Sequence, residues 1–201
     1  MKKLAQLALF SVWFVSSFAM GFDKSKGKKT LKVDTQNSKL VWKGKKFTGE
    51  HWGNINISNG SLIVDGTKLK GGAFDIDLKS ITVTDITDKN GNAKLVGHLK
   101  GEDFFAADKF PKSTFVITSA TPKDKENYEI AGKLTIKGVS REIKFPAVVT
   151  IDSKKATAKA KITINRTDFG IKYGSKSFFE NLGDKFIYDD FELDVTLTSA
   201  L

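Results

Sequence analysis

Apolar and polar residues alternate with a period of two along most of the chain after residue 39, and this pattern constrains the fold more than any other feature. A β-strand points successive side chains to opposite faces, so each alternating run predicts a strand with one apolar and one hydrated face, as is typical of antiparallel sheets. The apolar positions of four such runs are Phe74, Ile76 and Leu78; Tyr128, Ile130, Leu134 and Ile136; Ile143, Phe145, Ala147, Val149 and Ile151; and Phe191, Leu193, Val195 and Leu197.

Turn signals separate these runs. They are Asn59-Gly60, Asp65-Gly66, Lys89-Asn90-Gly91 and Lys137-Gly138. Short connections favour a meander, and about eight strands in one sheet would close into an up-and-down barrel without exposed edges. We therefore expect an all-β, antiparallel barrel. The chain of 201 residues is long enough for one such domain and too short for two.

The run 155–165 bears on whether the barrel is filled or hollow. Its inward face is expected to carry Ala156, Ala158, Ala160, Ile162 and Ile164, so half of this face is small. Large side chains from the facing strands would fill the gap by ordinary packing. Alternatively, the missing volume is an apolar tunnel. The alternation leaves both interpretations open.

The first 21 residues have the order of a secretory signal peptide: two lysines, an apolar run over residues 4–18, and small residues after it. Cleavage fits after Ala19 or after Gly21. An uncleaved membrane anchor is the alternative, although about 15 apolar residues fall short of the roughly 20 that span a bilayer. Residues 22–37 are expected to form a basic, flexible arm and residues 38–201 the barrel domain. We expect a periplasmic location, with secretion beyond the envelope left open.

The chain has no cysteine and a net charge of +10. Without cysteine there is neither a disulfide nor a lipid-anchored residue after the signal peptide. A positive surplus of this size suits nucleic acid, an anionic membrane surface or solubility alone. Export argues against nucleic acid, so transient contact with an anionic membrane is the partner that the charge leaves open. Homodimerisation is also left open.

Residues with catalytic or metal-binding chemistry are scarce. The only histidines are His51 and His98, which are too few for a zinc site in a chain without cysteine. No HExxH, Walker, GxSxG or GxGxxG motif occurs. We therefore expect that the protein is not an enzyme and has neither a metal site nor a cofactor. Each histidine is interpreted either as a structural ring held by hydrogen bonds or as a polar contact for a ligand head group in an apolar pocket.

Two adjacent phenylalanines follow the one expected helix, a short segment over residues 92–101 that a glycine ends. They are Phe104 and Phe105. Neighbouring side chains diverge on a helix or a strand, so one buried surface cannot easily hold both rings. A second pair, Phe178 and Phe179, lies in an expected connecting loop. Each pair is interpreted either as core packing or as part of a ligand site.

Three segments in fixed order carry a more specific signal: GHLKGEDFFAADKFPKSTF (97–115), GKLTIKGVSREIKFP (132–146) and INRTDFGIKYGS (164–175). Together they resemble the YceI-like family of exported, polyisoprenoid-binding proteins, and the likeness covers residues 38–198. Trp52 and the stretch 181–192 depart from the commonest form of the family, which leaves the ligand open. The matching positions are His98, Leu99, Asp103, Phe104, Phe105, Pro111, Thr114, Phe115, Gly132, Leu134, Thr135, Ile136, Gly138, Arg141, Arg166, Asp168, Phe169, Gly170 and Ile171.

The resemblance implies a lipocalin-like barrel with a short helix, which holds a polyisoprenoid, a prenyl quinone or a similar long-chain lipid in an apolar interior. It favours the tunnel over the filled barrel. The implied function is that of an exported carrier that acts by burial and not by reaction. The alternative is an envelope stress or interaction protein with a filled barrel and no lipid ligand.

Candidate site residues follow from the same resemblance. Phe104 and Phe105 are expected to divide between packing under the helix and facing the cavity, and Phe178 and Phe179 to line or close its opening. For Arg166 an ion pair with Asp168 or another carboxylate is the alternative. The expected apolar wall is Trp42, Phe104, Phe105, Phe115, Phe145, Ala158 and Phe169, and the expected contacts for a polar head group are His51, His98 and Arg166.

Overall fold

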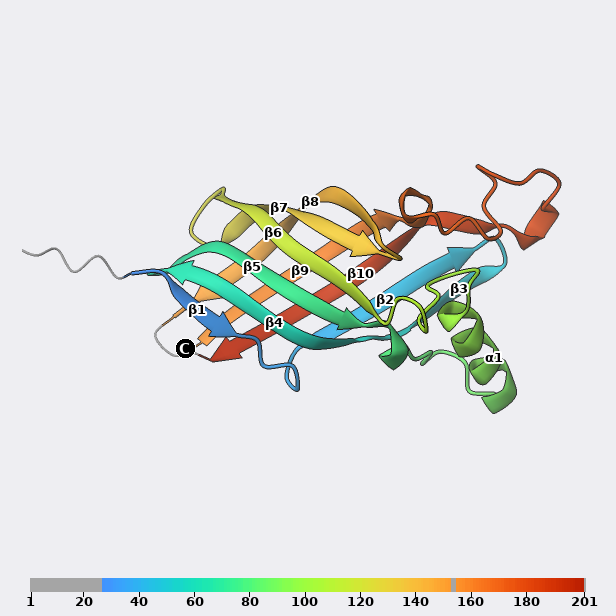
Figure 1. Cartoon of the computed structure of the whole chain (residues 1–201), viewed down its shortest axis with the longest axis horizontal. Helices are drawn as coiled ribbons and strands as arrows, with labels where there is room; N and C mark the ends of the chain where they lie inside the picture. Colours follow the sequence, from blue (N-terminus) through green and yellow to red (C-terminus); the bar gives the residue numbers. More distant parts are fainter. Residues whose placement is uncertain (1–26, 153–154, 201) are drawn as a thin grey trace, which may run out of the picture.

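The computed structural model describes residues 27–152 and 155–200, and it shows one curled antiparallel sheet with a helix at one end (Figure 1). The predicted signal peptide, residues 1–21, lies outside the described residues. The elements are β1 (Lys29–Lys32), β2 (Lys39–Lys46), β3 (Gly49–Asn54), β4 (Asn56–Asp65), β5 (Lys68–Asp77), η1 (Leu78–Ser80), α1 (Lys89–Lys100), β6 (Lys112–Pro122), β7 (Asn127–Ile136), β8 (Val139–Ile151), β9 (Lys155–Asn165), η2 (Arg166–Phe169), η3 (Gly183–Lys185) and β10 (Ile187–Ala200).

The strand order is β1-β4-β5-β6-β7-β8-β9-β10-β2-β3, so β4 to β10 form the predicted meander. Strands β3 and β4 are one long strand broken at Ile55. The Ile55 amide donates to the Leu40 carbonyl of β2 at 3.1 Å, and beyond this break the strand leaves β2 and pairs with β5. This change of partner brings the two ends of the sheet together. The predicted all-β, lipocalin-like barrel is confirmed.

The described part of the sheet has ten strands and not about eight. The break at Ile55 divides one long strand into two, and β1 adds a strand to the edge. The prediction of a flexible arm over residues 22–37 is wrong for residues 29–33, because β1 pairs with β4 and Val33 forms a bridge with Ser199. Leu31 and Val33 are buried and Lys32 between them is exposed, which is the same period-two pattern on a shorter scale.

Two of the four turn signals are confirmed. Asp65-Gly66 connects β4 to β5, and Lys137-Gly138 connects β7 to β8, with positive φ at Gly66 (60°), Lys137 (51°) and Gly138 (76°). Lys89-Asn90-Gly91 begins α1 instead of forming a hairpin. Asn59-Gly60 lies inside β4, beside a bulge, where a Cβ on Gly60 would come within 3.0 Å of Phe74 and Val33. That glycine serves close packing and not a turn.

The predicted helix is confirmed as α1, at one end of the barrel (Figure 1). The Asp88 carboxylate accepts a hydrogen bond from the Gly91 amide at 2.6 Å, which caps the helix, and Gly101 ends it. The segment before α1 covers the free edge of β3: the Thr82 amide donates to Asn54 and the Thr84 amide to Trp52, each at 2.9 Å. Covering this edge removes a site for unwanted strand pairing.

The core consists of two clusters of buried residues. One lies toward α1 and η2 and includes Leu99, Phe104 and Ile171. The other lies toward β1 and the far ends of the strands, and includes Leu62 and Ala156. Side chains from both clusters surround an interior cavity.

Candidate ligand-binding site

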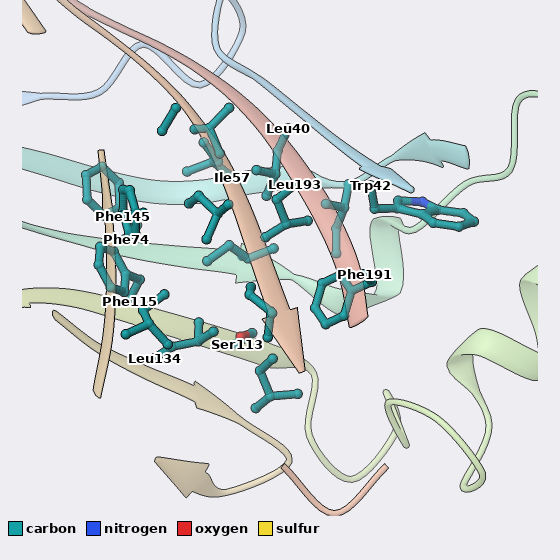
Figure 2. Close-up of a pocket in the computed structure, with 18 of the residues that line it drawn as sticks. Leu40, Trp42, Ile57, Phe74, Ser113, Phe115, Leu134, Phe145, Phe191 and Leu193 are labelled. Carbon is teal, nitrogen blue, oxygen red and sulfur yellow. The ribbon is translucent and has the colours of Figure 1, made fainter. Parts of the chain in front are cut away.

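An apolar cavity of about 210 Å³ lies inside the barrel (Figure 2). Its walls come from β2 and from β4 to β10, so nearly the whole sheet contributes. Of the two alternatives left open by the sequence, a filled or a hollow barrel, the structure shows a hollow barrel with a small cavity. An apolar cavity of about 150 Å³ is large enough to bind benzene, whereas sites for drug-sized ligands typically measure about 300–1,000 Å³.

Strand β9 contributes the small side chains of the wall. Ala158, Ala160, Ile162 and Ile164 all line the cavity, as the alternation predicts. Ala156 is fully buried at the end of the same face and does not line it. The two alanines leave space that β-branched or aromatic residues at these positions would occupy.

Three phenylalanines from β5, β6 and β8 form an aromatic wall (Figure 2). Phe74 and Phe115 stack with ring centroids 6.4 Å apart, and Phe115 and Phe145 are tilted at 5.6 Å. Phe115 reaches across β7 to Phe145 because the intervening residue is Gly132, whose missing side chain leaves room for the ring. Sequence reasoning identified Phe115 and Phe145 but not Phe74, although Phe74 shared the predicted inward face of its strand.

Trp42 lines the cavity from β2, and Figure 2 shows it with Phe191 on the side away from Phe145. Its indole Nε1 donates to the Thr82 carbonyl at 3.0 Å. The polar atom of the ring is therefore satisfied outside the cavity, and the ring presents only apolar surface to the interior.

Phe104 and Phe105 both line the cavity. The chain turns sharply after α1, with the Phe105 amide bonded to the Leu99 carbonyl at 3.1 Å and φ of 47° at Ala106. This irregular backbone, neither helix nor strand, lets both rings face inward. The prediction that one ring packs under the helix and the other faces the cavity is half right. Phe104 does both, because its ring also packs against that of His98 on α1 with centroids 4.9 Å apart.

Phe169 does not line the cavity, in contrast to the prediction. It ends η2 and is buried in the cluster near α1, with 2% of its surface exposed. The second pair, Phe178 and Phe179, is about half exposed and also lies away from the cavity wall. A 3-10 turn and a loop do not follow strand alternation, so the inward faces of these residues could not be derived from it.

The two histidines are held by carboxylates outside the cavity, and neither ring lines it. His51 Nδ1 lies 2.7 Å from Asp85, and His98 Nε2 lies 3.2 Å from Asp103. Burial raises the pKa of Asp85, but hydrogen bonds from the His51 ring and the Trp52 amide outweigh it, so that this pKa is lowered. The geometry supports the structural interpretation of both histidines and not a head-group contact.

Arg166 is the one head-group candidate that touches the cavity, and it is 4% exposed. Its Nε donates to Tyr188 O at 3.1 Å, Nη1 to Ile171 O at 2.9 Å, and Nη2 to Ile187 O at 3.0 Å and to Asp189 Oδ1 at 3.3 Å. Burial lowers the pKa of Arg166, and the Asp189 carboxylate opposes that shift. The predicted alternative, an ion pair of Arg166 with Asp168 or another carboxylate, is confirmed, and the partner is Asp189.

A few polar residues reach the cavity that sequence reasoning did not identify. Ser113 is buried and donates to the Thr135 carbonyl at 2.7 Å, so it offers no free donor hydrogen. The others, Lys45, Lys159, Tyr188 and Asp190, come from strand positions of the hydrated face. Whether such a residue reaches the cavity depends on where neighbouring strands separate, and the alternation of apolar and polar residues does not predict this.

Within residues 27–152 and 155–200, no group of three or more metal-ligating side chains is placed to hold a metal ion. In the same part of the chain, no helix combines the length and the apolar character needed to cross a bilayer.

Comparisons with known proteins agree with this fold. A UPF0312 protein of Pseudomonas putida (strain W619) is 26% identical over 126 residues, which are 60% of this chain and 63% of that protein. The match thus spans just under two thirds of that relative's length. A UPF0312 protein of Pseudomonas savastanoi pv. phaseolicola is 26% identical over 180 residues, covering 85% of this chain and 88% of the relative.

Solved structures share the architecture. BcnA of Burkholderia cenocepacia superimposes with a TM-score of 0.66 at 25% identity, covering 83% of this chain and 98% of BcnA. A polyisoprenoid binding domain from Saccharophagus degradans, implicated in plant cell wall breakdown, gives a TM-score of 0.60 at 16% identity, covering 84% and 97%. The second likeness shows the fold alone. The family model of the YceI-like domain matches residues 31–199, and the chain belongs to the YceI-like family.

Proposed function

We propose that this protein is an exported, periplasmic carrier that holds a polyisoprenoid, a prenyl quinone or a similar long-chain amphiphile in its cavity and releases it unchanged. One observation carries the proposal: both core clusters line the cavity, and its buried charge, Arg166, is already paired with Asp189 and donates to three carbonyl groups. Such an interior suits an apolar chain better than a polar substrate. The polyisoprenoid-binding Saccharophagus domain with the same fold supports this choice.

The driving force is burial of the chain. Each methylene removed from water contributes about 0.8 kcal/mol, so ten of them contribute about 8 kcal/mol before the costs of association. Association costs at least about 4 kcal/mol, so a micromolar dissociation constant, which needs about 8 kcal/mol net, requires burial of about fifteen methylenes or more. No directed polar contact inside the cavity is required for useful affinity.

The size of the cavity favours a slender ligand. A volume of about 210 Å³ is small beside common ligand sites, so a narrow prenyl chain fits the interior better than a ring system. A long chain fills more volume than this and requires wall residues such as Phe115 to change rotamer. A head group then lies at the rim of the cavity.

The lining residues favour binding over catalysis. Among the described residues that line the cavity there is no histidine, and Lys45 is paired with Glu192 at 2.7 Å. The other titratable groups, Lys159, Tyr188 and Asp190, come from strand positions of the hydrated face, and Arg166 is held by Asp189. A general acid or base must lie within hydrogen-bond reach of the reacting group. We infer that a bound chain leaves the protein in the chemical form in which it arrived.

We further propose that one end of the barrel makes transient contact with an anionic membrane. Exposed Phe47, Phe178 and Phe179 lie in the β2–β3 turn and in the segment between η2 and β10, which project at the same end (Figure 1). Lys172 lies 4.5 Å from the ring centre of Phe178 and Lys176 lies 3.6 Å from that of Phe186. Aromatic rings and lysines together suit a lipid interface, where each basic residue contributes about 1 kcal/mol.

Uptake and membrane contact are tested separately. For uptake, the mature protein carrying Trp52→Phe is titrated with geranylgeraniol and with a short-chain ubiquinone, and quenching of Trp42 is expected to saturate at one ligand per protein. Absence of quenching by both compounds contradicts the carrier.

Membrane contact is tested by sedimentation with phosphatidylglycerol vesicles. The bound fraction of the protein is expected to fall with added salt and in the variant Phe178→Ser/Phe179→Ser. Equal binding to phosphatidylcholine vesicles contradicts that contact.

A further inference from the structure

The wall of the barrel is incomplete between β8 and β9. Their pairing runs from Ile151↔Ala156 to Val148↔Lys159 and ends there, although β8 begins as far back as Val139. The other neighbours of these strands behave differently. Strand β7 pairs with β8 from Asn127↔Val148 to Ile136↔Val139, and β10 pairs with β9 along its whole length. The gap therefore belongs to this one pair of strands.

Pro146 accounts for the end of the pairing. The Val149 amide donates to the Glu126 carbonyl beside β7, so odd-numbered amides of β8 point toward β7 and even-numbered ones toward β9. If the register continued, Pro146 would face Lys161 and would be the next residue to donate to β9. Proline has no amide hydrogen, so the bond that would extend the ladder past Val148 is missing.

A surface hollow of about 570 Å³ lies over this gap. Its lining includes Pro146 and Val148 of β8 and Lys161 of β9. Four residues line both this hollow and the interior cavity: Phe145, Ala147, Lys159 and Ala160. Phe145, Ala147 and Ala160 point inward from their strands, so the hollow and the interior cavity adjoin the same stretch of wall between β8 and β9.

The rim of the hollow carries an excess of positive charge. Lys144, Lys159 and Lys161 are exposed, and within the described residues none of them forms an ion pair. Of the two carboxylates that line the hollow, Glu129 is paired with Lys123 at 3.5 Å. Asp194, opposite Lys161 on β10, is the other. Three lysines facing one unpaired carboxylate favour an anionic ligand group.

We propose that the gap between β8 and β9 is a side portal of the cavity, through which an apolar chain passes while Lys144, Lys159 and Lys161 hold an anionic head group outside. The head group is a carboxylate or a phosphate, since both accept hydrogen bonds from ammonium groups. The proposal rests on the carrier function and adds a route and a head-group charge to it. It places the head group beside small residues of the wall and away from Arg166.

The probe for this portal is cis-parinaric acid, a slender fluorescent fatty acid, with its methyl ester as the uncharged counterpart. Because the chain has no cysteine, Lys144→Cys/Thr163→Cys introduces the only thiols, at positions that would face each other across the gap. Uptake and release rates are measured by stopped flow for the same variant with and without a bifunctional thiol crosslinker. The control pair is Lys133→Cys/Glu142→Cys, which are partners on the continuous β7–β8 ladder.

Crosslinking across the gap is expected to slow both rates at least tenfold, and crosslinking of the control pair is expected to leave them unchanged. Equal uptake and release rates with and without the crosslink across the gap overturn the portal while leaving the carrier function intact. If the wild-type protein takes up geranylgeraniol but neither probe, the portal and its head-group site are overturned. If it takes up none of these compounds, the carrier function itself fails. The two failures are therefore distinguishable.

The head-group assignment is tested with Lys144→Gln/Lys159→Gln/Lys161→Gln. Affinity for the acid is expected to fall about five- to tenfold, and affinity for the ester to stay the same. The control with equal net charge is Lys68→Gln/Lys70→Gln/Lys125→Gln, at exposed lysines outside the hollow. An equal effect of the two triple variants, or an equal effect on acid and ester, overturns the assignment.

Discussion

A methyl group on Gly132 of β7 would lie 2.5 Å from Cζ of Phe115 on β6. The ring of Phe115 therefore occupies the space that any other residue at position 132 would need. This relationship lets the aromatic wall of the cavity run from β5 across β7 to β8. A glycine of the family motif thus has a direct packing role in the site.

Replacing Gly132 by alanine is expected to destabilise the protein by about 1–3 kcal/mol, because the new methyl group overlaps Phe115 and the Val116 carbonyl. Urea unfolding followed by circular dichroism measures the change. The control is Gly97→Ala, on an exposed position of α1 with nothing within 4 Å of the added Cβ. That change is expected to stabilise by about 0.5–1 kcal/mol. Equal stability of wild type and Gly132→Ala would contradict the packing role.

Enlarging Ala158 to phenylalanine is expected to abolish ligand uptake, because the ring would occupy the cavity that Ala158 lines. Overpacking costs about 1–3 kcal/mol, so Ala158→Val is measured beside it as a milder step that retains the fold. The control, Thr157→Phe, adds the same ring on the outer side of β9. If Ala158→Phe folds and takes up ligand like the wild type, the chain does not lie where we place it.

The buried pair of Arg166 and Asp189 is expected to stabilise the fold without contacting the ligand head group. Arg166→Met leaves three carbonyl groups and a carboxylate without their donor, and we expect a loss of about 3–5 kcal/mol. Asp189→Asn keeps the three carbonyl bonds but leaves the buried guanidinium charge without its counter-ion, and it is expected to cost about 3 kcal/mol. Ligand affinity of Asp189→Asn is expected to match the wild type. A tenfold gain in affinity for an anionic ligand, with the guanidinium released from its carboxylate, would assign Arg166 to the head group after all.

The pairing of His51 with Asp85 predicts a pH dependence of stability. The pKa of Asp85 is lowered in the folded protein from its ordinary value of 3.8, so the carboxylate stabilises the fold above that pH. This contribution disappears as the pH falls through the lowered folded pKa. Asp85→Asn is therefore expected to reduce the free energy of unfolding near neutral pH and to match the wild type in strong acid. A difference that stays constant from pH 7 to pH 2 would contradict this role.

Much of the barrel could be predicted from the sequence because strand alternation assigns each side chain to a face. The inward positions of Phe145 and Ala158 follow directly from it, whereas Phe115 was expected in the wall only from the family resemblance. Alternation failed where the backbone leaves the strand geometry. Phe169 ends a 3-10 turn, and its side chain packs beside the cavity and not in its wall.

Other features depend on contacts between distant parts of the chain. His51 and Asp85 are 34 residues apart, so the neighbours of His51 in the sequence do not reveal its partner. Gly60 follows an asparagine, as in a hairpin turn, yet packing against Val33 and Phe74 decides its place inside a strand. In the sequence, Pro146 is one outward position of an alternating strand. Its effect on the barrel wall is apparent only from the register of β8 with both neighbours.

The most direct test of the carrier function is native mass spectrometry of the mature protein purified from its own envelope, followed by solvent extraction of whatever is bound. The account predicts an added mass of one long-chain amphiphile per protein, which the extract identifies as a prenyl or similarly slender compound. A ligand-free mass, together with no uptake of added prenyl quinones or fatty amides, would contradict the account and favour an envelope interaction protein.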